Sequence, residues 1–290
     1  MDQRIRPTFR LAPAKVNLAL HVTGRRDDGY HLLQSLVGFC SFGDLLAVEP
    51  SEEDELIVTG PFAAHVPISD DNLVIAARDR LRAFLGSRDT PAVRIRLEKN
   101  LPVASGVGGG SSDAATALKE LTALWAPDVP ASRLHEIALA LGADVPMCLE
   151  GRALRAEGVG ERLVPVGPLP PLPMILVNPG PAVSTAHVFG ALERRDNPPL
   201  PDLPDSLPLP GLLARLEETR NDLQQAAAGL APDITAVLAE LGEAGARFAR
   251  MSGSGATCFG IFPSLLLAEE AARGLSRRRP EWFVKATVAQ

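Results

Sequence analysis

The sequence has little cysteine and no long apolar run. Its three cysteines, Cys40, Cys148 and Cys258, lie far apart in apolar surroundings, so we expect reduced thiols and no disulfide framework or zinc site. No uninterrupted apolar run approaches the roughly 18 residues of a membrane-spanning helix. The charged N-terminus is not followed by an apolar segment, which argues against a secretory signal. These absences together predict a cytoplasmic protein.

Aromatic residues and runs of one charge sign are also scarce. Aromatics make up 4% of the 290 residues and the net charge is -6. Without a basic stripe, the chain is not expected to bind nucleic acid or an anionic membrane. The hydrophobic fraction of 46% and the charged fraction of 22% are those of a globular protein with a core of Leu, Val, Ile and Ala. The length favours two domains.

Two segments have the alternation of half-buried strands. Apolar residues at 16, 18, 20 and 22 alternate with Asn17, Ala19 and His21, so Lys15 and Asn17 share one face of the first strand. A second strand is predicted over 93–97, and Pro102 should end its pairing.

Helical periodicity begins after the glycines at 106–110. Ala114, Leu118, Leu121 and Trp125 lie on one stripe, with Ser111 or Ser112 as the natural N-cap. A further helix is predicted over 132–141, with Gly142 in the C-capping position and Asp144 directly after it.

The second half of the chain begins with a proline-rich stretch at 165–181 that encloses an apolar strand at 174–178. We place a domain boundary near its start, giving domains 1–165 and 166–290. An extended loop is predicted at 197–210, helices near 211–227 and 233–244, a turn at 252–255 and a strand at 257–262. Strands and helices mixed without regular alternation predict an α+β fold.

One loop has the composition of a phosphate-binding site. It runs from a strand to a helix and has four glycines in five positions, so backbone N–H groups can approach an anion without obstruction by Cβ atoms. The helix that follows adds free N–H groups and a positive dipole end. The loop comprises Pro102, Val103, Ala104, Ser105, Gly106, Val107, Gly108, Gly109, Gly110, Ser111 and Ser112.

A flexible linker would be the alternative, but a linker seldom joins a strand to an amphipathic helix. The loop has no Lys after its last glycine and does not fit G-x-G-x-x-G, so neither a Walker A motif nor a dinucleotide-binding fold is predicted.

Three segments together resemble the GHMP small-molecule kinases. These are residues 13–18 (PAKVNL), the glycine loop, and residues 251–256 (MSGSGA). The segments 24–32, 142–146, 158–161 and 221–223 extend the resemblance over essentially the whole chain. It implies an N-terminal ribosomal-protein-like α/β nucleotide domain and a C-terminal ferredoxin-like domain. Ala104 and Ser105 depart from the family, which often has glycines there.

The resemblance implies a reaction and roles for residues. The expected reaction is phosphorylation by ATP, with Mg2+, of the 2-hydroxyl of a cytidine diphosphate-linked methylerythritol in non-mevalonate isoprenoid biosynthesis. Asp144 would take the proton from that hydroxyl, and Lys15 would stabilise the developing negative charge. Besides the glycine loop, Lys99 and Asn72 would line the adenosine pocket. The substrate would contact Asn17, Tyr30, His31, Thr185, Phe189 and Gly253.

Several of these residues also have a simpler interpretation. On pattern alone, Lys15 could mark a sheet edge and Asp144 a cap or surface charge. Phe189 could be a core residue, Gly253 part of a plain turn, and Lys99 and Asn72 solvent-facing.

Two other functions remain open at this point. The chain could be a related kinase for homoserine, mevalonate or a sugar, or a non-catalytic nucleotide sensor or RNA-binding module. The pair Tyr30 and His31 favours a cytidine-bearing substrate, and Lys15 together with Asp144 favours catalysis. We expect a monomer or weak homodimer.

Overall fold

The chain forms two compact units that interleave along the sequence. The computed structural model describes residues 8–69, 71–86, 90–180, 182–202, 204 and 206–290. The first unit contains the residues up to Pro13, Gly43–Val103 and Gly109–Glu150, and the second contains Ala14–Phe42, Ala104–Gly108 and Gly151–Gln290. Strands β1 (Arg10–Arg25) and β2 (His31–Pro50) contribute residues to both. The predicted boundary at 165 stays a prediction.

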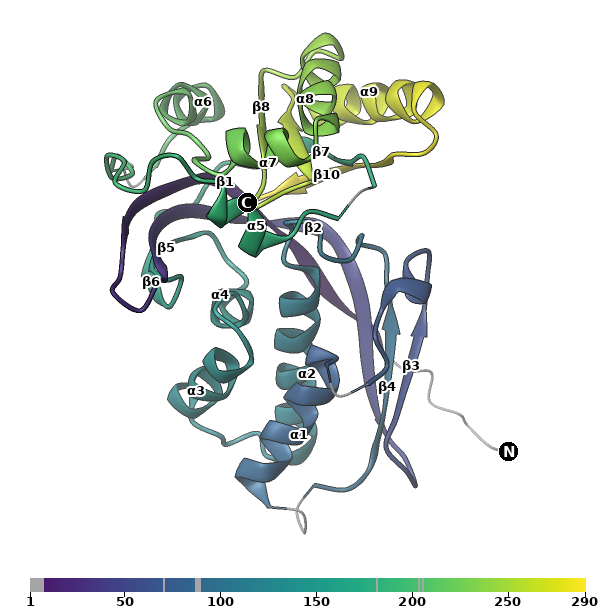
Figure 1. Ribbon diagram of the computed structural model, residues 1–290. Coiled ribbons are helices and arrows are strands. Elements are labelled where there is room, and N and C mark those ends of the chain that lie inside the picture. The colour runs from purple at the N-terminus through teal and green to yellow at the C-terminus, as the bar shows by residue number, and fades with distance from the viewer. Residues whose placement is uncertain (1–7, 70, 87–89, 181, 203, 205) are drawn as a thin grey trace. The chain divides into compact units, whose positions relative to one another are not determined.

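The first unit combines a small sheet with helices. Strand β4 (Val93–Glu98) pairs in parallel with β3 (Glu55–Thr59) and antiparallel with the end of β2, where Leu45 lies opposite Glu98. Helices α1 (Leu73–Leu85) and α2 (Gly109–Trp125) pack side by side (Figure 1). The 3₁₀-helix η1 (Ala63–His65), α3 (Ala131–Leu141) and α4 (Val145–Glu150) complete the unit.

The second unit is organised around antiparallel strands. Strand β10 (Phe283–Ala289) pairs with β7 (Leu172–Asn178), which pairs with β9 (Cys258–Ile261), and β9 pairs with β8 (Phe248–Met251). The first part of β2 pairs with β5 (Leu154–Gly158), and β5 pairs with β6 (Arg162–Pro165).

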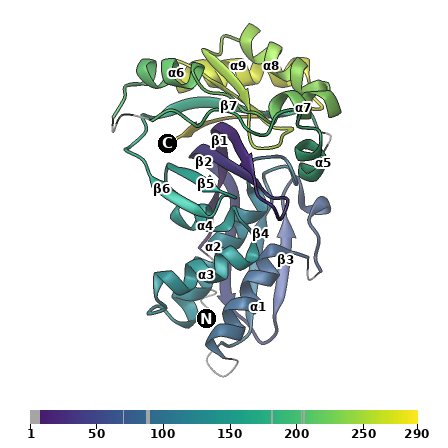
Figure 2. The same cartoon turned by 60° about the vertical axis from the view of Figure 1, so that its left-hand side comes forward.

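Helices cover one face of the β7–β10 sheet. Helix α9 (Leu265–Arg278) packs on β10 and β7, and α8 (Asp233–Glu243) packs on β9 and β8 (Figures 1 and 2). The unit also contains α5 (Thr185–Gly190), α6 (Leu209–Glu217) and α7 (Gln224–Leu230). Ile175, Val177, Ile234, Val237 and Leu275 are fully buried in its core. Burial of such aliphatic side chains contributes most of the stabilisation of the sheet and helix layers.

The mixture of helices and sheets confirms the α+β prediction. The strands at 93–97 and 174–178 and the helices at 132–141 and 233–244 form within one or two residues at their ends, and the strand at 16–22 forms as part of the longer β1 (Arg10–Arg25). The three cysteines are free and buried, and burial raises the pKa of the Cys40 thiol to about 12. No helix in the described ranges is long and apolar enough to cross a membrane.

The predicted start of α2 is wrong by about one turn. The helix begins at Gly109, so Ser111 and Ser112 lie in its first turn and neither is the N-cap. A Cβ at position 109 would lie 3.0 Å from Lys99 Nζ, so glycine lets the start of α2 pack closely against this ammonium.

The predicted helix over 211–227 is also wrong, because α6 and α7 replace it. The segment between them bonds to β1: the N–H of Leu20 donates to the carbonyl of Arg220, and the N–H of Asp222 donates to the carbonyl of Leu20, both at 2.9 Å. The buried guanidinium of Arg250 donates to the carbonyls of Leu216 and Thr219. These long-range bonds replace the intrahelical ones and end α6.

Candidate active site

Strand β1 holds Lys15 and Asn17 on one face, as predicted. The ammonium of Lys15 donates to Asn17 Oδ1 at 3.0 Å, and each residue is only 4% exposed. The backbone N–H of Lys15 donates to the carbonyl of Val107 at 2.9 Å. Lys15 is therefore a buried cation fixed beside the glycine loop, and it does not mark an exposed sheet edge.

Ser252 joins the glycine loop to β1. Its hydroxyl donates to the carbonyl oxygen of Gly106 at 2.9 Å and accepts the backbone N–H of Asn17 at 3.0 Å. A Cβ on Gly106 would lie 2.5 Å from the Ser252 carbonyl oxygen, and Gly106 has φ +81. Only glycine permits this approach. The segments 14–18, 104–108 and 251–256 therefore meet in the second unit.

Asn221 supports the turn at 252–255. Its Nδ2 donates to the carbonyls of Met251 and Gly253, at 2.8 and 2.9 Å. Gly253 has φ +56, and a Cβ there would lie 2.9 Å from the Gly106 carbonyl oxygen. The turn is thus held closely against the glycine loop. The sequence marked residues 221–223 only through the family resemblance, without a role.

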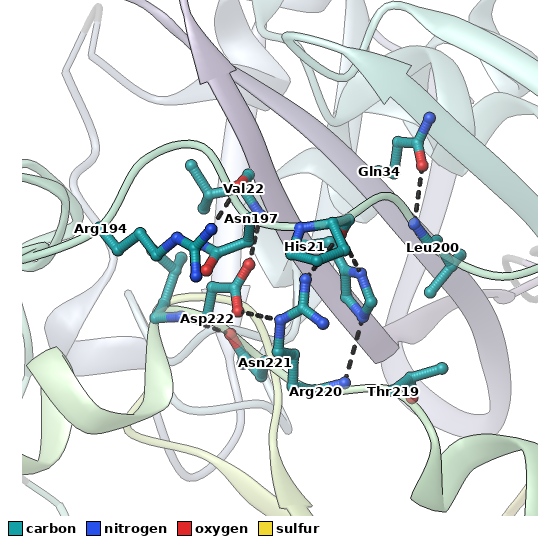
Figure 3. Close-up of polar contacts among 12 residues, drawn as sticks. His21, Val22, Gln34, Arg194, Asn197, Leu200, Thr219, Arg220, Asn221 and Asp222 are labelled. Atoms are coloured by element: carbon teal, nitrogen blue, oxygen red, sulfur yellow. Dashed lines mark hydrogen bonds and ion pairs between the residues drawn. The ribbon is translucent and has the colours of Figure 1, made fainter.

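Next to Asn221, His21 and Asp222 connect β1 to two loops, one at Pro198 and one at 220–222 (Figure 3). His21 Nδ1 lies 3.1 Å from the carbonyl oxygen of Pro198, and the N–H of Arg220 donates to Nε2 at 3.2 Å. Because a carbonyl only accepts, Nδ1 carries the proton and the ring is neutral. Burial, assisted by the charge of Arg220, lowers the pKa of His21. Asp222 accepts from the N–H of Val22 at 2.7 Å.

In the first unit, a buried cation lies between two carboxylates below the start of α2. Lys99 Nζ is 2.5 Å from Asp44 Oδ2 and 2.6 Å from Asp113 Oδ2. Asp44 Oδ1 also accepts the N–H groups of Asn100 and Leu101. Burial disfavours the charge of Lys99, but the attraction of Asp113 and Asp44 outweighs it and raises the Lys99 pKa. Burial raises the pKa of Asp113 to about 8 despite the neighbouring Lys99.

The interpretation of Lys99 and Asn72 as solvent-facing residues is wrong. They are 3% and 5% exposed. Asn72 caps α1 by accepting the N–H of Val74 at 2.8 Å, and its Nδ2 donates to the carbonyl of Pro67. Their contact with adenosine stays a prediction. Sequence reasoning missed Asp44 and Asp113, although an aspartate directly before the largely apolar run 114–118 of the predicted helix was a usable signal for Asp113.

The three aromatic side chains expected to contact the substrate, Tyr30, His31 and Phe189, belong to the second unit. The rings of His31 and Phe189 stack with centroids 4.8 Å apart and an interplanar angle of 25°, while Tyr30 is 65% exposed. Burial lowers the pKa of His31, and the charges of Arg195 and Arg25 add to this effect. At the start of α5, the hydroxyls of Thr185 and Ser254 are 2.8 Å apart, which places Thr185 beside the 252–255 turn.

Comparison with known proteins identifies the family. The GHMP kinases N terminal domain model matches residues 72–152, and the GHMP kinases C terminal model matches residues 208–281. The chain belongs to the GHMP kinase family.

Individual relatives of this GHMP kinase are similar over their full length. It is 54% identical to the 4-diphosphocytidyl-2-C-methyl-D-erythritol kinase of Mesorhizobium japonicum, over 99% of this chain and 97% of that protein. A crystal structure of 4-(cytidine 5'-diphospho)-2C-methyl-D-erythritol kinase aligns with TM-score 0.81 and 37% identity, over 97% of this chain and 99% of that chain. Homoserine kinase from Cytophaga hutchinsonii aligns with TM-score 0.65 and 17% identity, covering 100% of this chain and 96% of that chain, which shows a shared fold.

Asp144 of this GHMP kinase follows α3, and its backbone carbonyl accepts the N–H of Cys148 in α4. The short helix α4 was not predicted, and Pro146 is tolerated near its start. Asp144 belongs to the first unit and Lys15 to the second.

The residues of this GHMP kinase fit a metal that arrives with a nucleotide. Among the described residues, no group of three His, Cys, Asp or Glu side chains could hold a metal ion. Ser112 Oγ and Asp113 Oδ1, near the start of α2, are buried without a hydrogen-bond partner. Hard oxygen atoms of this kind suit Mg2+, which keeps phosphate and water oxygens among its ligands.

Proposed function

We propose that this chain transfers the terminal phosphoryl group of ATP to the 2-hydroxyl of 4-diphosphocytidyl-2-C-methyl-D-erythritol, in non-mevalonate isoprenoid precursor biosynthesis. The observation that carries the proposal is the 54% identity to a kinase of that name over 99% of the chain. We propose further that it works in the cytoplasm as a monomer or weak homodimer.

The glycine loop and the first turn of α2 would bind the triphosphate. Gly106 and Gly108, both with positive φ, open the backbone for close approach of phosphate oxygens. The free N–H groups at the start of α2 would bind the anion further along the loop. When bound, Mg2+ supplies neutralisation of the triphosphate charge, with Ser112 Oγ and Asp113 Oδ1 as the groups that would face it.

Lys15 and Asp144 would act on the transferring phosphoryl group and the acceptor. As the acceptor oxygen bonds to phosphorus and the bond to the leaving ADP oxygen breaks, the hydroxyl proton passes to the Asp144 carboxylate. The Lys15 ammonium would stabilise negative charge on the acceptor and phosphoryl oxygens. Its bond to Asn17 Oδ1 limits the directions in which it can donate.

Tyr30, His31 and Phe189 would bind the cytosine. The 4.8 Å separation of the His31 and Phe189 rings leaves no space for a base between them, so the base would stack on an outer face or separate the pair. Tyr30, 65% exposed, offers a free face. Each stacking contact is worth about 1–3 kcal/mol, which favours a nucleotide-linked alcohol over a plain one. Thr185 and Gly253 would contact the same substrate near the 252–255 turn.

The test is a panel of acceptors with the purified protein, ATP and Mg2+. ³¹P NMR should detect a new phosphomonoester and ADP with 4-diphosphocytidyl-2-C-methyl-D-erythritol, and little product with mevalonate, homoserine or galactose. Phosphorylation of one of the other alcohols instead would replace the substrate assignment. Binding of ATP without transfer to any acceptor would favour a nucleotide-binding module.

A further inference from the structure

Beneath the catalytic face of β1, a serine of the next strand contacts Asn17. Ser35 lies on β2, paired with Ala156 of β5, and is only 3% exposed. Its hydroxyl donates to the carbonyl oxygen of Ala19 at 2.7 Å. Asn17 Nδ2 donates to Ser35 Oγ at 2.7 Å. All these residues belong to the second unit.

The direction of these bonds follows from the chemistry of the end groups. A backbone carbonyl only accepts, so the single hydroxyl proton of Ser35 is committed to Ala19. Toward Asn17 the Ser35 oxygen can then only accept, and it must face the NH₂ end of the amide. The carbonyl end of the amide consequently faces Lys15, whose ammonium only donates. The orientation of the Asn17 amide is therefore fixed at both ends: its NH₂ group faces an oxygen that can only accept, and its carbonyl oxygen faces an ammonium that can only donate.

We propose that Ser35 is a positioning residue for the phosphoryl transfer, which sets the orientation of the Asn17 amide and through it the direction of the Lys15 ammonium. The inference rests on the proposed role of Lys15. The two side-chain hydrogen bonds of Ser35 reach Ala19 and Asn17, and neither reaches the glycine loop or the turn at 252–255. Its effect on the reaction passes through Asn17.

Ser35→Ala removes the acceptor and leaves Asn17 Nδ2 without its partner in a buried position. The amide can then rotate and Lys15 loses a fixed acceptor. We expect kcat to fall about tenfold, the factor that corresponds to about 1.4 kcal/mol of transition-state stabilisation, with KM for ATP changed less than about threefold. Ser35→Thr keeps the hydroxyl on a strand that favours β-branched residues and should restore most of kcat. Ser41→Ala, on the same strand but exposed, is the matched control and should behave as wild type.

A double-mutant cycle separates positioning from a general structural effect. If Ser35 acts through Asn17, adding Ser35→Ala to Asn17→Ala should change kcat less than about twofold, because coupled residues are not additive. The proposal is overturned if the double variant loses kcat by the product of the two single-variant factors, or if Ser35→Ala alone is fully active.

A direct measurement covers the case in which Asn17→Ala is too slow to measure. In ¹⁵N-asparagine-labelled protein, the Asn17 side-chain NH₂ signal, identified by its loss in Asn17→Ala, should exchange slowly with water in wild type and Ser35→Thr. It should exchange at least about tenfold faster in Ser35→Ala, since slow exchange reports a persistent hydrogen bond. Equal exchange in all three overturns the proposal. Lys15→Met tests the proposed function separately: if it stays active, the role of Lys15 fails, whatever the NMR result.

Discussion

Asp113→Asn should change how the stability of the first unit depends on pH. Asp113 is buried with Lys99 and Asp44 as its charged neighbours, and its pKa is raised to about 8 from the value near 4 of an unfolded aspartate. Between these two values the folded protein binds more protons at this group than the unfolded one. The sign of the linkage relation then makes the free energy of unfolding fall as pH rises through the window from about 4 to about 8.

The magnitude follows from the same relation. A group that is fully protonated in the folded state and fully deprotonated in the unfolded state changes the free energy of unfolding by at most about 1.4 kcal/mol per pH unit. From pH 5 to pH 7 we therefore expect the wild type to lose about 1–3 kcal/mol relative to Asp113→Asn. The amide NH₂ group of asparagine cannot accept a hydrogen bond as a carboxyl oxygen can, which adds an offset that does not depend on pH. The prediction is therefore the difference in slope between the two proteins.

Tryptophan fluorescence provides the assay. The chain has two tryptophans, and Trp125 at the end of α2 lies under the guanidinium of Arg82, 5.0 Å from its ring centroid. In a Trp282→Phe background, Trp125 alone reports unfolding of the unit that contains Asp113. Urea unfolding at pH 5, 6 and 7 gives the free energies with and without Asp113→Asn. Parallel pH dependences for the two proteins would refute the reasoning.

Two further substitutions test supporting features. His21→Gln should retain an acceptor for the Arg220 N–H but remove the titration of a ring whose pKa is lowered. Because a lowered pKa costs stability as pH falls below about 6.5, and His31 still titrates in the variant, the melting temperature should drop less between pH 7.5 and pH 5 in the variant than in wild type. Equal acid sensitivity of the two proteins would contradict this. Ala104→Gly replaces a residue at φ 51. Removal of the Cβ relieves about 1–2 kcal/mol of backbone strain in the folded state, whereas the greater flexibility of glycine in the unfolded state costs about 0.5–1 kcal/mol of stability. The midpoint of urea unfolding should therefore rise slightly, and a clear decrease would show that the Ala104 conformation is not strained.

Local patterns were sufficient for the parts of the fold that local rules govern. Alternation at 16–22 placed Lys15 and Asn17 on one face, and the contact between them confirms it. Gly142 was predicted to follow a helix, and its N–H does bond to the carbonyl of Ala138 at the end of α3. These features depend on neighbours a few residues apart in the sequence.

Features set by distant residues could not be predicted from local patterns. The break between α6 and α7 depends on Leu20 and Arg250, and periodicity within 211–227 contains no trace of either. The burial of Lys99 depends on Asp44, 55 residues away. Ser35 has no motif of its own, and its bond to Asn17 becomes visible only when β1 and β2 are paired.

The central claim is that this chain phosphorylates the cytidine-linked alcohol with Asp144 as the proton acceptor. The most direct measurement is single-turnover transfer from ATP to 4-diphosphocytidyl-2-C-methyl-D-erythritol by wild type and Asp144→Asn, with ATP binding measured in parallel by calorimetry. We predict that the variant binds ATP with an affinity within about threefold of wild type while transfer falls by at least about 10²-fold, the range for loss of a general base. Near-normal transfer by the variant would contradict the claim.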